Sequence, residues 1–194
     1  MSDHLVLTFA EIEFLLRVRE PQDVDVRAEL RLAGDGRNAA AGLASLLARG
    51  LCSHDGERVV PADDLVGVIG ALSTATTATK ALGWRDGQPV LLSLFTGPVV
   101  GLVLQPIGLG RYAVAALDPG RGLGDQLAGF IDSCLAGGNE SAVLVRSGDT
   151  RIAVVTTAAG EWYVSDSLAD PGTSRKSTRD GAVARVRELM AVPA

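Results

Sequence analysis

Few residues of this chain could carry out chemistry. Cys52 and His54 stand two positions apart, and a cysteine beside a histidine is the residue set of a nucleophilic thiol. That chemistry needs opposed side chains and an oxyanion hole, which two residues of one turn seldom provide. Cys52 and Cys134 are far apart in sequence and each has an apolar neighbour, which favours two buried thiols; the alternative is a disulfide, which needs an oxidising compartment. We therefore expect no catalytic residue and a protein that is not an enzyme.

Metal binding is also poorly supported. Zinc sites use three or four Cys or His ligands at characteristic spacing, and the chain has only two cysteines and two histidines in all. Asp23 and Asp25 could hold a hard cation together with Asp63 and Asp64. The first pair, however, lies on the polar side of an alternating segment, which is better explained by contact with solvent. No metal and no other cofactor is predicted.

A glycine-rich turn precedes one of the expected helices. Gly120, Gly122 and Gly124 stand close together, and a helix N-terminus can hold an anion. The dinucleotide-binding fingerprint needs a further glycine three residues after the second one, and Asp125 occupies that position. Since Asp125 already complements the helix dipole, a loop before a capped helix is favoured. An enzyme that uses this turn is a minor alternative.

The charge of the chain argues against a nucleic-acid partner. The formal net charge is −5, whereas binding to phosphates needs a positive field. One basic cluster near the C-terminus lacks interleaved aromatic residues and is diluted by aspartate and glutamate. We interpret it as a solvated loop and helix face, or else as a docking patch for an acidic partner. The cluster consists of Arg175, Lys176, Arg179, Arg185 and Arg187.

A winged-helix regulator with an α+β sensor domain is the alternative function, because the first 75 residues combine a strand, helices and a small turn. The helix that would read DNA, 38–49, exposes little beyond Asn38, Ser45 and Arg49. Base reading needs several Arg, Lys, Asn or Gln side chains on one helix face. Sequence-specific DNA binding is therefore not expected.

The elements that position these residues follow from local patterns. Thr8 and Glu11 form a T-x-x-E capping box between a short strand, 5–7, and an apolar helix. Residues 23–32 alternate between apolar and charged side chains, which predicts a half-buried strand. Residues 54–57 are expected to form a turn, and residues 167–178 a polar loop.

Further helices and strands are expected along the rest of the chain. The helices cover 38–49, 61–72, 123–135 and 178–190, and the strands cover 74–84, 90–95, 99–105, 111–117, 141–146, 151–156 and 161–165. Because no alternating βαβ pattern occurs, the predicted fold class is α+β, with a mainly antiparallel central sheet flanked by helices. We expect a single domain, 1–194, possibly subdivided into a strand and helix part, 1–75, and a sheet with two helices, 76–194.

One long uncharged stretch raises the question of a membrane. Residues 87–110 carry no charge and are numerous enough to span a bilayer. Pro98 would break a helix in the middle of that stretch, and two buried strands joined at 96–98 explain it better. The N-terminus lacks the basic region of a signal peptide. A soluble, cytoplasmic protein without membrane insertion is expected.

Several segments together resemble the EspG proteins of type VII (ESX) secretion. Residues 5–11, Leu-Val-Leu-Thr-Phe-Ala-Glu, resemble their opening strand and T-x-x-E helix. Residues 44–51 resemble their L-x-x-R-G-L element, and Gly56 with residues 60–61 resembles the continuation G-x-V-x-P-x-L. Trp-Tyr-Val at 162–164, followed by an arginine-rich helix, is also similar. The resemblance is scattered over most of the chain, which is shorter than the usual member.

The resemblance implies a cytosolic chaperone. EspG proteins of mycobacteria and their relatives bind the tip of secreted PE–PPE heterodimers, and their fold is a central antiparallel sheet between helical bundles. A PE–PPE or WXG100-like protein is thus the implied partner. In the family, the hairpin loop that follows the first helical bundle contributes to recognition, and residues 85–88 are the nearest match here.

The candidate partner-binding residues are Trp84, Arg85 and Gln88. The sequence Arg-Asp-Gly-Gln at 85–88 is a hairpin signal between two expected strands. Tryptophan and arginine are the residue types most enriched at binding hot spots. The alternative is that Trp84 belongs to the core of its strand.

Overall fold

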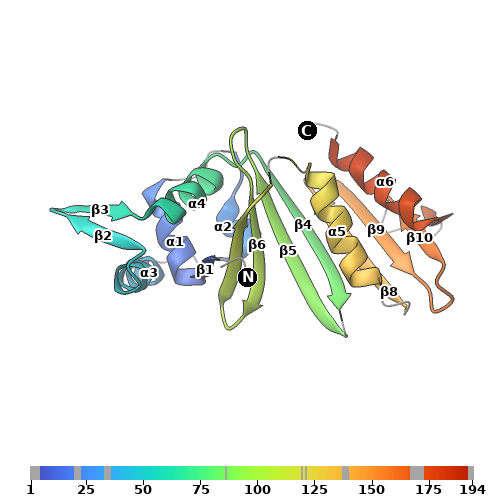
Figure 1. The fold of residues 1–194 in the computed structure, drawn as a ribbon, viewed down its shortest axis with the longest axis horizontal. Coiled ribbons are helices and arrows are strands. Elements are labelled where there is room, and N and C mark those ends of the chain that lie inside the picture. The colour runs from blue at the N-terminus through green and yellow to red at the C-terminus, as the bar shows by residue number, and fades with distance from the viewer. Residues whose placement is uncertain are drawn as a thin grey trace. The chain divides into compact units, whose positions relative to one another are not determined.

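An antiparallel sheet flanked by helices makes up most of the structure, a computed structural model that describes residues 5–19, 23–32, 36–85, 87–118, 120, 122–136, 140–166 and 173–191 (Figure 1). For residue 189 only the backbone is described. The nine strands stand in the order β1-β7-β6-β5-β4-β8-β9-β10-β11. The pairs β1–β7, β6–β7, β4–β8, β8–β9, β9–β10 and β10–β11 are antiparallel. The predicted fold class is confirmed.

The strands of this sheet are short to moderate in length. They are β1 (Leu5–Thr8), β4 (Thr77–Arg85), β5 (Gln88–Thr96), β6 (Leu102–Gly108), β7 (Arg111–Ala116), β8 (Ser141–Ser147), β9 (Thr150–Thr156), β10 (Trp162–Ser165) and β11 (Arg175–Ser177). A separate two-stranded sheet consists of β2 (Cys52–Asp55) and β3 (Arg58–Pro61). The helices are α1 (Phe9–Val18), α2 (Val26–Leu30), α3 (Gly36–Ala48), α4 (Asp63–Ser73), α5 (Leu123–Leu135) and α6 (Arg179–Ala191).

The chain forms two compact units. Unit 1 comprises Met1–Ala78 and Leu94–Leu117, and unit 2 comprises Thr79–Ser93 and Asp118–Ala194. The units thus interleave in sequence, because residues 94–117 belong with the N-terminal part. The expected subdivision into 1–75 and 76–194 stays a prediction.

In unit 1, the capping box joins β1 to α1 as predicted. The Thr8 hydroxyl accepts from the Glu11 backbone N–H at 3.2 Å, and the Glu11 carboxylate accepts from the Thr8 backbone N–H at 2.7 Å. Helix α1 packs closely on α3, because Gly42 brings the two backbones together: a Cβ there would overlap the Ala10 carbonyl. The apolar core of this unit is built from α1, α4 and one face of strands β1, β6 and β7. It includes Leu7, Ile12, Leu16, Leu65, Leu72 and Leu104.

The strand predicted at residues 23–32 is wrong. Residues 26–30 form helix α2, and the Asp25 side chain accepts from the Ala28 backbone N–H at 3.0 Å, as an N-cap does. The alternating pattern contains apolar residues four positions apart, so Val26 and Leu30 fall on one helical face and are buried. Ala28, which a strand would bury with them, is exposed. The pattern therefore fits the period of a strand and that of a helix, and the N-cap Asp25 favours the helix.

The segment after α3 is a β-hairpin and not only a turn. Strands β2 and β3 pair antiparallel, and Gly56 between them has φ +60°. His54, expected in the turn, lies exposed on β2. Gly50 ends the preceding helical segment with φ +70°, as its position after residues 38–49 predicts.

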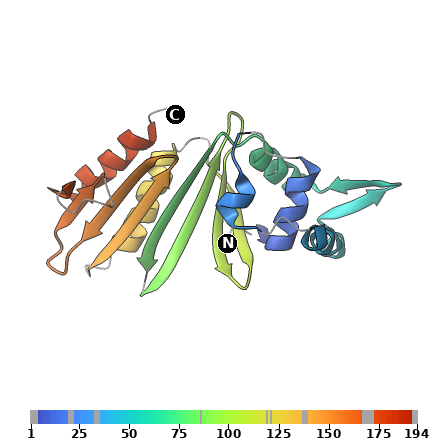
Figure 2. The same cartoon turned by 180° about the vertical axis from the view of Figure 1, so that it is seen from behind.

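In unit 2, helices α5 and α6 lie over one face of β8–β10. Figure 1 shows the two helices in front of these strands, and Figure 2, from behind, shows the orange strands in front of the yellow helix α5. Helix α5 has the predicted bounds and buries the predicted residues Leu127, Phe130, Ile131 and Cys134. The expected polar loop, 167–178, contains strand β11, which pairs with β10, and its residues 167–172 lie outside the described residues.

The uncharged stretch 87–110 forms β5 and β6, in agreement with the prediction of strands. Among the described residues, no helix combines the length and the apolar character needed to cross a membrane.

Candidate functional site

The three predicted partner-binding residues lie at the end of β4 and the start of β5, in unit 2. Trp84, Arg85 and Gln88 are all exposed, and the side chain of Trp84 is 39% exposed. The alternative that Trp84 is a core residue is therefore wrong. Gly87 makes the turn with φ +74°, and Asp86 lies outside the described residues.

The base of this hairpin is packed against α5. A Cβ on Gly83 would lie 2.7 Å from the Cys134 sulfur, so β4 approaches the helix closely. Arg85 donates a hydrogen bond to the hydroxyl of Ser133, which itself donates to the Phe130 carbonyl at 2.7 Å. Because successive side chains of a strand point to opposite faces, Arg85 points to the α5 side and Trp84 to the other. The structure thus brings the three residues to one turn but not onto one face.

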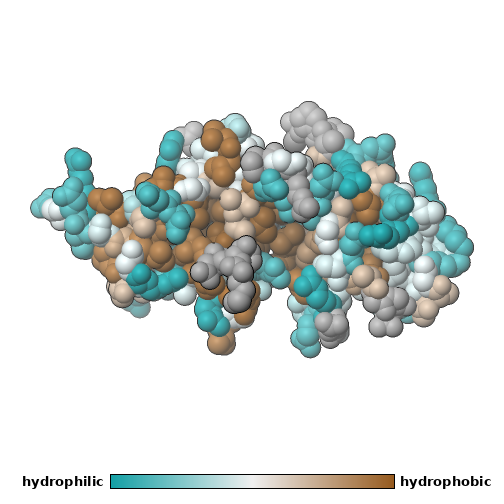
Figure 3. Space-filling view, in the orientation of Figure 1, coloured by the Kyte–Doolittle hydropathy of each residue, from teal (hydrophilic) through white to brown (hydrophobic). Residues whose placement is uncertain are grey.

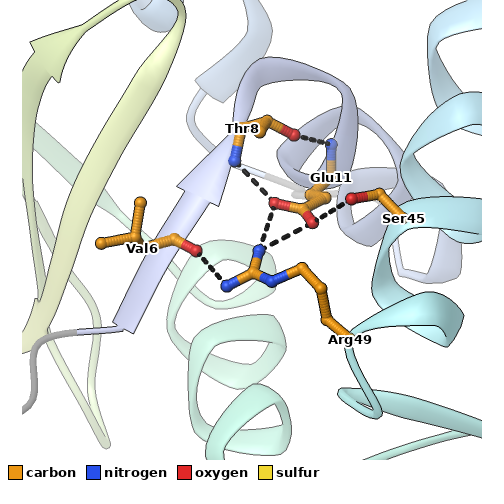
Figure 4. Close-up of polar contacts among 5 residues, drawn as sticks. All are labelled: Val6, Thr8, Glu11, Ser45 and Arg49. Carbon is orange, nitrogen blue, oxygen red and sulfur yellow. Dashed lines mark hydrogen bonds and ion pairs between the residues drawn. The ribbon is translucent and has the colours of Figure 1, made fainter.

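A polar cluster that the sequence predicts only in part lies in unit 1 (Figure 4). Both carboxylate oxygens of Glu11 accept hydrogen bonds from Nη1 of Arg49, at 2.8 and 2.9 Å. The Ser45 hydroxyl donates to the same carboxylate at 2.7 Å. Nη2 of Arg49 donates to the Val6 carbonyl at 2.8 Å. The cluster therefore ties β1, α1 and the end of α3 together.

Glu11 is ionised in this setting. Burial raises the pKa of its carboxyl group, but the hydrogen bonds from the Thr8 backbone, Ser45 and Arg49 outweigh that effect and hold the pKa below its ordinary value. The T-x-x-E pattern reveals half of this cluster. Its contact with Arg49, 38 residues away in the chain, carries no local signal.

A hollow of about 630 Å³ adjoins this cluster within unit 1. Its walls come from β1, α4, β6 and β7 and are mainly apolar. They include Leu5, Val6, Val68, Leu102 and Val114. Arg49 and Asp64 add one charge of each sign to the lining. Such a volume and lining are typical of ligand-binding sites.

The basic cluster near the C-terminus is largely neutralised by ion pairs. Arg179 pairs with Asp132 at 2.8 Å and Arg187 with Asp125 at 2.7 Å. The further pairs are Lys176–Glu161, Arg185–Asp166 and Arg185–Glu188. These pairs do not leave a concentrated positive patch for an acidic partner.

The other candidate residues serve local structure. Asp25 caps α2, whereas Asp63 and Asp64 occupy the first turn of α4. Gly122 is the N-cap residue of α5, and Gly124 lies against Arg187. Within the part of the chain that the structure describes, no group of three or more His, Cys, Asp or Glu could hold a metal ion.

The two cysteines are buried and are not joined in a disulfide, as predicted. Burial raises the pKa of the Cys52 thiol, which keeps it protonated and lowers its reactivity. Cys52 and His54 lie two residues apart on β2 but in different environments: Cys52 is buried and His54 is exposed. A buried, protonated thiol is not the activated thiolate that a nucleophilic cysteine needs.

Comparison with known proteins does not assign the chain to a family. No model of a known protein family matches the sequence, and no curated protein matches it either. The geometry of the hairpin turn, of the Glu11 cluster and of the hollow therefore carries the functional argument.

Proposed function

We propose that this protein is an EspG-like accessory protein that binds a secreted partner of type VII secretion, of the PE–PPE or WXG100-like kind, and catalyses no reaction. The observation that carries the proposal is an exposed tryptophan at a hairpin turn whose base is held by α5. Trp84, Arg85 and Gln88 form the contact.

The chemistry of the turn supports a protein contact. Burial of the exposed part of a tryptophan ring gains roughly 25 cal/mol for each Å² of apolar surface removed from water. Arg85 is held by Ser133, and a preorganised arginine loses less conformational entropy when it binds. A rigid base with exposed side chains at its turn is typical of interaction sites.

The arrangement of unit 1 supports the likeness to EspG proteins. Two of the segments that carry the resemblance, 5–11 and 44–51, are distant in sequence, and they meet through the ion pair between Glu11 and Arg49. A shared contact gives a physical reason for both motifs to occur in one chain. The antiparallel sheet flanked by helices agrees with the fold that the resemblance implies.

The winged-helix alternative receives less support. Ser45 and Arg49, two of the three polar residues expected on the DNA-reading helix, hydrogen-bond to Glu11. Base contacts by these side chains would break the cluster. The net charge of −5 opposes approach to phosphates as well.

Capture of the partner from the native host tests the proposal. Tagged wild-type protein, Trp84→Ala and the double variant Arg85→Ala/Gln88→Ala are compared by pull-down and mass spectrometry. We expect the wild type to retrieve a secreted helical protein and the hairpin variants to lose at least tenfold, as about 1.4 kcal/mol of a hot spot implies.

The matched control is a second exposed hairpin of unit 2, between β8 and β9. Asp149→Ala/Arg151→Ala removes two exposed side chains there and should retrieve the partner as well as wild type does. Equal loss in both hairpin variants, or equal retention in both, would contradict the assigned contact. A DNA fragment in place of a protein would favour the regulator.

A further inference from the structure

We infer that the hollow of unit 1 is a second docking site, which takes an apolar segment of the protein partner that carries a basic residue. The inference rests on the proposed protein-binding function and names the chemistry of the partner at a surface distinct from the hairpin turn. It follows from the size of the hollow, the state of Arg49 and the charge of Asp64.

The hollow is large because small residues surround it. Gly67 on α4 and Ala115 and Ala116 on β7 take the place of larger side chains in its lining. A Cβ on Gly67 would meet no atom within 4 Å. The resulting volume of about 630 Å³ can take several aliphatic side chains and lies within the roughly 300–1,000 Å³ of ligand sites.

Arg49 forms a part of the wall whose position is fixed and whose positive charge is balanced by Glu11. Its Nη1 is bonded to the buried Glu11 carboxylate and its Nη2 to the Val6 carbonyl, as Figure 4 shows. The positive charge is therefore already balanced by a carboxylate that no ligand can reach, since Glu11 is 0% exposed. A free anion gains little at this wall.

Asp64 leaves the hollow with a net negative charge. It is exposed in the first turn of α4, beside Asp63, and the helix dipole contributes only about half a positive charge there. The Asp64 carboxylate alone outweighs this half charge. A ligand with an apolar body and a positive group near it complements the site.

The surroundings favour a segment of a protein over a small molecule. Val66, next to Gly67, is 54% exposed, and Val99, next to the lining residue Val100, is 86% exposed. On the face drawn in Figure 3, brown apolar surface extends over the part of unit 1 formed by α1, α4 and β6. Apolar surface thus continues beyond the hollow, which suits a chain that crosses it.

A second copy of this chain is the competing occupant. Residues 107–111 form an exposed turn with Ile107, Leu109 and Arg111, which also combines apolar and basic side chains. Two copies would, however, bring together two net charges of −5. That repulsion favours a different, basic partner segment.

Helix α4 offers matched variants. A Cβ at Gly67 or Gly70 meets nothing within 4 Å, but only Gly67 lines the hollow. Gly67→Leu should therefore fill the hollow, and Gly70→Leu should not. Asp64→Asn removes the lining carboxylate, whereas Asp63→Asn removes its neighbour, which does not line the hollow.

The test is a titration of the full-length protein, followed by amide NMR shifts, with acetylated and amidated pentapeptides. The probe is Leu-Leu-Lys-Leu-Leu, and the comparison peptides carry Glu in place of Lys or Ser in place of Leu. We expect the Lys peptide to shift the amides of Val6, Gly67 and Ala115, and to bind about two- to fivefold more tightly than the Glu peptide. Gly67→Leu should weaken binding at least tenfold and Gly70→Leu should not; Asp64→Asn, but not Asp63→Asn, should remove the preference for Lys.

Each other result overturns the inference. Shifts outside the hollow, equal effects of the two glycine variants, or equal binding of the Lys and Glu peptides would exclude this site. Saturation of the same amides by 1-octanol as tightly as by the peptide would indicate a small-molecule site, and their concentration dependence without peptide would indicate a second copy. Since the titration needs no native partner, its failure is separate from a failure of the hairpin pull-down.

Discussion

The two units place their charges differently. In unit 1 the Glu11 carboxylate is fully buried and receives its hydrogen bonds from Thr8, Ser45 and Arg49. In unit 2 the ion pairs remain in contact with water: the side chains of Arg179 and Asp132 are 60% and 33% exposed. The pairing of an arginine with a carboxylate therefore has different consequences in the two units, because a buried carboxylate that loses its partner cannot be solvated by water instead.

Apolar side chains show the reverse distribution. Among the described residues, the exposed large apolar side chains belong to unit 1, apart from Trp84. They are Phe9, Val18, Val60, Val66, Val99, Ile107 and Leu109. Unit 1 thus combines buried charge with exposed apolar surface, and unit 2 combines exposed charge with one exposed tryptophan. Under the proposed protein-binding function, we expect apolar contacts in unit 1 and a contact centred on Trp84 in unit 2.

The largest effect is expected from Arg49→Met. It removes the cation from a fully buried carboxylate, and the free energy of unfolding should fall by about 3 kcal/mol, the lower end for a broken buried pair because Arg49 itself is partly exposed. Urea denaturation measures it. Arg179→Met, the matched change in unit 2, should cost much less, because both partners of that ion pair stay in contact with water. Equal losses would mean that burial does not distinguish the two pairs.

A smaller effect is expected from a methyl group at Gly42. Its Cβ would overlap the Ala10 carbonyl, and two backbones must separate, so Gly42→Ala should cost about 2 kcal/mol despite the better helix propensity of alanine. In unit 2, Gly124→Ala meets Arg187 in the first turn of α5, where a helix end can shift, and should cost less. Thermal denaturation compares the two. A Gly42 variant as stable as wild type would refute the close packing of α1 on α3.

The stability of unit 1 should depend on pH through Glu11. Since the pKa of Glu11 is lower in the folded state, its stabilising contribution is complete above the unfolded pKa and is lost as the pH falls through the folded pKa. Wild type should therefore lose more stability in acid than Glu11→Gln. Salt should change this difference little, because the carboxylate is buried. In unit 2, the pKa of Asp166 is lowered by the hydrogen bond from Arg185 at an exposed site, so Asp166→Asn should show a difference that salt removes.

The smallest effect on stability is expected at the hairpin turn. Arg85→Ala/Gln88→Ala removes exposed side chains and one surface hydrogen bond, and the free energy of unfolding should change by only about 0.5 kcal/mol. Loss of the partner without loss of stability would then identify a contact. A large loss of stability would instead show that Arg85 serves the packing of β4 on α5, and the pull-down could not be interpreted as loss of a contact.

Sequence patterns predict the elements whose signals are local. The capping box of Thr8 and Glu11 and the inward residues of α5 are correct, because neighbours along the chain determine them. The strand predicted at 23–32 is wrong because residues 26 and 30 fit the period of a helix as well as that of a strand. Only the N-cap at Asp25 distinguishes the helix from the strand. Strand β11 is too short and too polar for a local sequence pattern to predict it.

The candidate sites are less predictable than the elements. Exposure of Trp84 depends on whether other elements cover this end of β4, and the sequence of β4 alone does not predict that. The hollow arises from small residues on α4 and β7, which are far apart in the chain. The sequence leaves the basic cluster at 175–187 open between a solvated face and a docking patch, because its ion-pair partners on α5 are distant in the chain. Asp125 and Asp132 are 62 and 47 residues away from the arginines that they contact.

The hydrogen bond from Arg49 to the Val6 carbonyl also protects an edge strand of the sheet. Strand β1 stands at one end of the strand order, so the backbone groups on its free side are open to pairing with any extended chain. Arg49 covers the carbonyl of Val6, and the Glu11 carboxylate covers the N–H of Thr8. A side chain that neutralises a buried acid thus also shields this edge from aggregation, and loss of Arg49 would expose both at once.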